Sequence, residues 1–111
     1  MMDGKTIADW QREAWTIAED KGFHDGLPCD RHGTLVRLCL IHTEISEAAQ
    51  LVKRHGLGAM NADVGHELAD TCIRLFELAY MLDIDLELAI ETKMALNRKR
   101  PYKYGTPDES R

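Results

Sequence analysis

Two pairs of acidic residues recur at helical spacing in the middle of the chain. Glu44 and Glu47 are three residues apart, and Glu67 and Asp70 repeat that spacing further along. Side chains at this spacing lie on one side of an α-helix, so each pair presents its carboxylates together. If two such helices pack antiparallel, both pairs can converge inside a bundle. A set of oxygen ligands without His or Cys suits Mg²⁺, with Mn²⁺ as a substitute, better than zinc.

The first acidic pair, Glu44 and Glu47, lies in a helical stripe that is otherwise apolar. At about 100° per residue, the other members of this stripe are Val36, Leu40 and Leu51. Carboxylates one turn apart repel each other, and burial raises the cost unless a cation neutralises them. A single pair of this kind is usually a solvated helix face, because glutamate is common there. Two pairs on facing helices favour a metal site.

A cation and an amide follow near the end of the chain. Lys93 and Asn97 share a helical face with Ile90, and Arg100 lies in the short basic segment that comes next. Phosphate oxygens can be bound by Mg²⁺ on one side and by Lys or Arg on the other. These residues therefore predict binding of a phosphate chain beside the acids. For residues 98–99 the simpler interpretation is that they complement a helix dipole.

Helices are expected to position all of these residues. Apolar residues recur at helical rather than alternating spacing, and residues that interrupt structure are concentrated in a few places. Helices are predicted over about residues 6–21, 34–56, 62–82 and 86–100. Asp85 is the expected N-cap of the last helix, and Pro101 stops it. No segment has the pattern of a strand, so the chain is predicted to be all-α with a four-helix bundle-like protomer.

Composition limits the classes of protein to which the chain can belong. The 111 residues are 44% hydrophobic and 30% charged, which is typical of a single globular domain over residues 1–111. With 14 Lys and Arg against 19 Asp and Glu, the net charge of −5 argues against nucleic-acid binding. Three cysteines without CxxC spacing, and no signal pattern, favour a cytoplasmic protein. No apolar stretch approaches the roughly 20 residues of a membrane span.

In their order along the chain, these motifs resemble the MazG-like nucleoside triphosphate pyrophosphohydrolases of the all-α NTP pyrophosphatase superfamily. The resemblance covers residues 34–105 and includes both acidic pairs, Lys93, Asn97 and the Arg100-Pro101 end. It implies that Mg²⁺ is bound by four acids, namely Glu44, Glu47, Glu67 and Asp70. It also implies that Lys93, Asn97 and Arg100 hold the substrate phosphates.

The family works as dimers or tetramers of paired bundles, so the resemblance implies a homo-oligomer. The helix that carries Glu44 has two apolar stripes, the one described above and a broader one formed by Leu38, Ile41, Ile45, Ala49 and Val52. Such an assembly would also explain why there are two. Some members have a further acid beside the first motif, where this chain has Thr43 and Ala48. The number of metal ions therefore stays open.

The reaction implied by the resemblance is hydrolysis between the α- and β-phosphates of a nucleoside or deoxynucleoside triphosphate, giving the monophosphate and pyrophosphate. Glu44 or Glu47 would take the proton of the attacking water. Phosphoribosyl-ATP, dUTP and dCTP are alternative substrates. A non-catalytic, dimerising, metal-binding helical module is the alternative of another class.

The preference for one nucleobase is expected to depend on residues 6–33. Trp10 and Trp15 lie about 140° apart on a helix, so they cannot both face one pocket.

Overall fold

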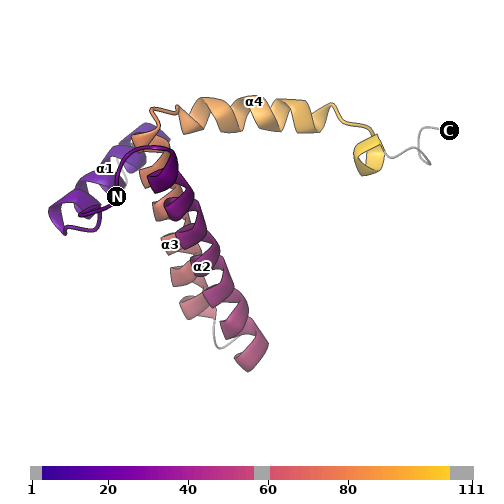
Figure 1. Cartoon of the computed structure of the whole chain (residues 1–111). Helices are drawn as coiled ribbons and strands as arrows, with labels where there is room; N and C mark the ends of the chain where they lie inside the picture. The colour runs from indigo at the N-terminus through magenta and orange to yellow at the C-terminus, as the bar shows by residue number, and fades with distance from the viewer. Residues whose placement is uncertain (1–3, 57–60, 106–111) are drawn as a thin grey trace.

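The computed structural model describes residues 4–56 and 61–105, and this part of the chain is all-helical, as predicted (Figure 1). In chain order the elements are α1 (Ile7–Asp20), α2 (Arg31–His55), α3 (Asn61–Met81), α4 (Leu86–Arg98) and a short 3₁₀ helix, η1 (Tyr102–Gly105). None of the described helices is both long enough and apolar enough to cross a bilayer.

Side-chain caps fix where the helices begin. Asp85 accepts a hydrogen bond from the Leu88 backbone N–H, as expected for the N-cap of α4. Asp30 accepts in the same way from Gly33, so α2 begins at Arg31, three residues before the predicted start. The sequence periodicity locates the middle of a helix better than its first turn, because the cap lies outside the apolar pattern.

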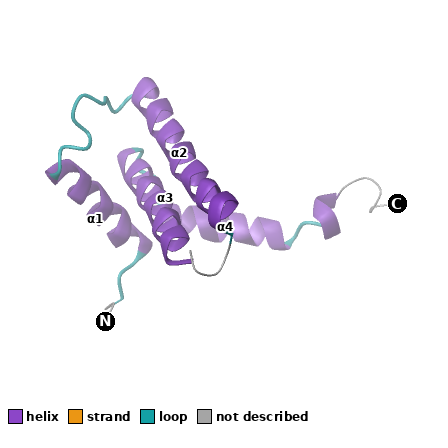
Figure 2. Cartoon of the chain, turned by 90° about the horizontal axis from the view of Figure 1, so that it is seen from below, coloured by secondary structure: helices purple, strands orange, loops and turns teal. Residues whose placement is uncertain are grey.

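Helices α1, α2 and α3 pack together, with α3 between the other two (Figure 2). Helix α4 leaves the end of α3 and runs away from this three-helix unit (Figure 1). No residue of α4 is buried. The predicted four-helix protomer is therefore a three-helix unit with one projecting helix.

The junction before α4 is held by the buried side chain of Gln11 on α1. Gln11 donates from Nε2 to the Ile84 carbonyl at 2.9 Å, and its Oε1 accepts from the Leu86 N–H at 3.3 Å. Glu87 also accepts from the Ile7 N–H at 3.4 Å. These bonds set the direction in which α4 starts.

The core of the three-helix unit is small. The buried apolar side chains among the described residues are Ala14, Ala18, Ile41, Ala48, Leu78 and Ala79. Alanines contribute little apolar area, so one copy of the chain gains limited hydrophobic stabilisation.

A buried arginine fastens the segment between α1 and α2. Arg37, which is 6% exposed, donates from Nη1 to the Pro28 carbonyl at 2.8 Å and from Nη2 to the Leu27 carbonyl at 3.4 Å. His24 lies against it and stacks on Trp15, with ring centroids 3.9 Å apart. The segment is thereby held onto both helices.

We expect stability to fall as the pH drops below 6.5 because of His24. Burial, and then the charge of Arg37, lower the pKa of His24 from 6.5, outweighing the carboxylates of Glu19 and Asp25. The unfolded chain then binds more protons than the folded one in the window just below 6.5, so protonation favours unfolding there. Urea unfolding at pH 7.5 and 5.5 should show the loss.

The matched variant for this test is His24→Phe, which keeps a ring against Trp15 but cannot titrate. Burial raises the pKa of nearby Glu77, which gives the opposite pH dependence and is shared by both proteins. The difference between the two proteins therefore reports His24 together with its contact to Glu77, whose Oε1 lies 3.9 Å from His24 Nε2. An equal loss of stability in His24→Phe would contradict the assignment.

Candidate metal centre

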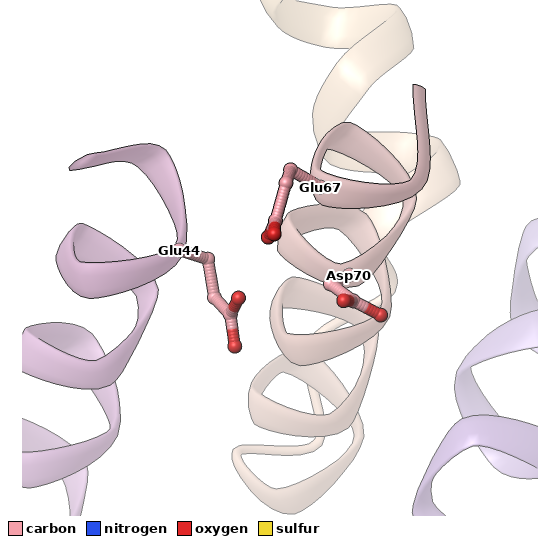
Figure 3. Close-up of side chains that lie close together, drawn as sticks. All are labelled: Glu44, Glu67 and Asp70. Atoms are coloured by element: carbon pink, nitrogen blue, oxygen red, sulfur yellow. The ribbon is translucent and has the colours of Figure 1, made fainter. Parts of the chain in front are cut away.

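Three of the predicted acids come together between α2 and α3. Glu44 extends from α2 and Glu67 extends from α3 toward it, while Asp70 lies one turn further along α3 and points to the other side in this view (Figure 3). One carboxylate oxygen from each residue can be chosen so that all three lie within 4.8 Å of one another. These three residues are called the acidic cluster below. Their oxygens form the hard donor set that Mg²⁺ or Mn²⁺ prefers.

Glu47 is not part of the acidic cluster, although its charge acts on the residues of the cluster. The side chain of Glu47 is exposed, because three residues beyond Glu44 the helix has turned further toward solvent. Its carboxylate nevertheless contributes to the raised pKa of Glu67. The four predicted acids therefore form three clustered carboxylates with a fourth at the edge.

The environment of Glu67 indicates that a cation fits here. Its Oε1 atom is inaccessible to solvent and has no hydrogen-bond partner among the described residues. Burial raises the pKa of Glu67, the neighbouring charges of Glu47, Glu44 and Asp70 raise it further, and a hydrogen bond with the Glu44 side chain adds to the same shift. A buried carboxylate oxygen without a partner, facing other carboxylates, is costly unless a cation meets it or a proton neutralises the group.

One residue of this site, Arg74, is not predicted from the sequence. Its Nε donates to Glu44 Oε2 at 2.6 Å, so one member of the acidic cluster already has a positive partner. A signal was present, because Arg74 follows Asp70 by four residues and Glu67 by seven. The pair holds the Glu44 carboxylate in position.

The predicted phosphate-binding residues are not brought to the acidic cluster within one chain. Lys93 and Asn97 lie on α4 and are exposed, and Arg100, also exposed, follows that helix. Because α4 runs away from α2 and α3, these residues lie apart from the acids of the same chain (Figure 1).

An apolar cavity opens beside the acidic cluster. Its volume is about 640 Å³, and residues of α1 and α3 line it together with Phe23. Trp10 and Phe76 provide further aromatic surface, while Asp70 belongs both to this cavity and to the cluster. Trp15 is directed elsewhere and stacks on His24. The two tryptophans thus have separate roles, as their angular separation predicts.

Comparison with family models, with curated proteins and with solved structures found no match.

Proposed function

We propose that this protein is a Mg²⁺-dependent nucleotide pyrophosphohydrolase that cleaves nucleoside or deoxynucleoside triphosphates between the α- and β-phosphates. The observation that carries the proposal is the acidic cluster with the buried, unpartnered Oε1 atom of Glu67. The resemblance of the ordered motifs to the MazG-like family supplies the reaction. The products are the nucleoside monophosphate and pyrophosphate.

Each residue near the cluster has a distinct part in this proposal. Glu44, Glu67 and Asp70 hold the metal, which when bound neutralises phosphate oxygens and acidifies a water molecule. Glu47 accepts the proton of the attacking water, because it lies at the edge of the cluster and is exposed to solvent. Glu44 is less suited to this task, since Arg74 donates to it at 2.6 Å.

The apolar cavity supports a substrate that carries a nucleobase. A base inserted between Trp10, Phe23 and Phe76 would stack on aromatic surface. Asp70 belongs both to the cavity and to the acidic cluster, so a metal and phosphates held by the cluster would lie next to that base. The arrangement suits a flat, apolar group joined to a metal-bound phosphate chain.

A non-catalytic helical module that binds metal is the second candidate. The bond between Arg74 and Glu44 favours it, because this arginine already neutralises part of the acidic charge. In that case metal would stabilise the fold without any turnover.

The test is a panel of common NTPs and dNTPs, with phosphoribosyl-ATP added, incubated with and without Mg²⁺. We expect metal-dependent release of monophosphate and pyrophosphate, and a loss of about 100-fold or more in Glu47→Gln, since it removes the proposed base. Asp20→Asn, which changes an exposed acid at the end of α1, is the control and should retain activity. Release of orthophosphate, or no cleavage by folded, metal-loaded protein, would contradict the proposal.

A further inference from the structure

The charged side chains that line the apolar cavity beside the acidic cluster are all acidic. They are Glu13, Asp70 and Glu77, and the other polar side chains are the indole of Trp10 and the thiol of Cys72. The described residues that line the cavity include no lysine, arginine, amide or alcohol side chain. A polar group that enters the cavity therefore meets chiefly carboxyl oxygens, which accept hydrogen bonds.

Two of these three acids already have other partners. Asp70 belongs to the acidic cluster. Glu13 forms an ion pair with Lys5, and 45% of its side chain is exposed. Because Lys5 and water compete for its oxygens, Glu13 discriminates poorly between one ligand and another.

Glu77 differs from both, because it is secluded from water and has no partner of its own. Its side chain is 14% exposed, and it forms no hydrogen bond within residues 4–56 and 61–105. His24 Nε2 lies 3.9 Å from Glu77 Oε1, which is too far for a hydrogen bond. Burial raises the pKa of Glu77 more than the charges of Arg74 and Arg37 lower it. A ligand that donates a hydrogen bond to this carboxyl group would offset the cost of burying it.

Glu77 lies on the same face of α3 as Asp70, two turns further along the helix. Seven residues separate them, or about 10 Å along the helix axis. Both also line a smaller pocket of about 160 Å³, which reaches Glu44 of the acidic cluster. Their separation is comparable to that between the α-phosphate and the far edge of the base in an extended nucleotide. A nucleotide whose phosphates reach the acidic cluster can therefore turn the edge of its base toward Glu77.

We infer that Glu77 selects the nucleobase, favouring cytosine, adenine and guanine, which carry an exocyclic amine, over uracil and thymine, which do not. The inference rests on the function proposed above, because it places a nucleotide in the cavity. In either protonation state the carboxyl group of Glu77 keeps an oxygen that accepts from the amine. Uracil and thymine present two carbonyl oxygens beside a single N–H group on the same edge, so a carboxyl group there faces further acceptors.

A matched pair of nucleotides tests the selection without requiring cleavage. The probes are the α,β-methylene analogues of dCTP and dUTP, titrated calorimetrically in Mg²⁺. We expect the wild-type protein to bind the cytosine analogue about 10-fold or more tightly, and Glu77→Gln to lose most of this ratio, because an amide also donates to a uracil carbonyl. A general defect in the fold would weaken both analogues and leave the ratio unchanged.

Glu13→Gln is the matched control, since it makes the same change at an acid of the same cavity that is paired with Lys5. It should keep the wild-type ratio. Equal affinity of the wild-type protein for the two analogues would overturn the inference. So would a ratio that changes in Glu13→Gln and not in Glu77→Gln.

A second measurement uses only the wild-type protein and stays decisive if Glu77→Gln fails to fold. An α,β-methylene nucleotide with pyrimidin-2-one in place of cytosine lacks the amine and keeps the rest of the ring. We expect it to bind about 10-fold or more weakly than the cytosine analogue. Equal binding of the two would show that the amine is not recognised.

Cleavage of dCTP and dUTP separates this inference from the proposed function. Turnover with no preference for dCTP, or with a preference that Glu77→Gln retains, would contradict the inference and leave the proposed function in place. If the wild-type protein cleaves no nucleotide while the analogues bind with the expected ratio, the proposed function fails and the role of Glu77 in selection stands.

Discussion

We expect Glu67→Gln to remove the proposed metal binding, to lower the proposed nucleotide cleavage, and to make the metal-free protein more stable. The raised pKa of Glu67 means that the folded state disfavours its ionised form, so the wild-type protein loses stability as the pH rises above 4.5. Glutamine cannot ionise, so the variant does not lose stability as the pH rises in this way. Cleavage should fall about 100-fold or more, as expected when electrostatic stabilisation of the phosphates is removed.

Thermal unfolding in the presence of a chelator checks the stability half of this result. The variant should melt above the wild-type protein at pH 8, and the difference should shrink toward pH 4.5, where Glu67 is increasingly protonated. Mg²⁺ should raise the melting temperature of the wild-type protein only. A variant that melts below the wild-type protein in chelator would mean that contacts within the chain hold the Glu67 carboxylate. Such a result would remove the observation on which the metal site depends.

We expect Gly33→Ala to destabilise the protein severely, even though alanine is the better helix former. A Cβ atom at this position would lie 1.7 Å from the Pro28 carbonyl oxygen and 2.7 Å from its carbon. The backbone before α2 must then move, which breaks the bond from Arg37 to Pro28. We expect a loss of about 3 kcal/mol or more in the free energy of unfolding, which lowers the melting temperature by more than about 10 °C.

Gly65→Ala is the matched control, because it makes the same change inside α3 where no heavy atom lies within 4 Å of the added Cβ. Helix propensity alone then applies, and the variant should gain about 0.5–1 kcal/mol. Chemical denaturation of both variants measures the contrast. Equal effects at the two positions would show that the close approach of Pro28 to Gly33 does not restrict the chain.

Local patterns in the sequence predicted the helices and the acid pairs, because both depend on residues three or four positions apart. The spacing of Glu67 and Asp70 on one helix face was enough to place them together, and antiparallel packing of α2 and α3 brought Glu44 to them. Glu47 was harder to place, because a 60° difference around a helix separates a half-buried position from an exposed one.

The direction of α4 could not be predicted from the sequence, because it depends on contacts between distant residues. Gln11 bonds to Ile84 and Leu86, more than 70 residues away, and no periodic pattern indicates that pairing. Its effect on the site is large, since it separates Lys93 from the acids of its own chain. Arg74 was missed for another reason, because an arginine on a helix flank is usually solvated, and only the position of Glu44 shows that it is paired.

The alanine-rich core also limits the heat capacity change of unfolding. This quantity grows with the apolar area that unfolding exposes, and it is usually about 12–15 cal/mol/K per residue. A single copy that buries chiefly alanines among its described residues should fall below that range, and its stability curve should be flat around its maximum. Apolar surface covered by a second copy would raise the value. Calorimetry of the protein in solution therefore reports how much apolar surface the folded protein hides from water in total.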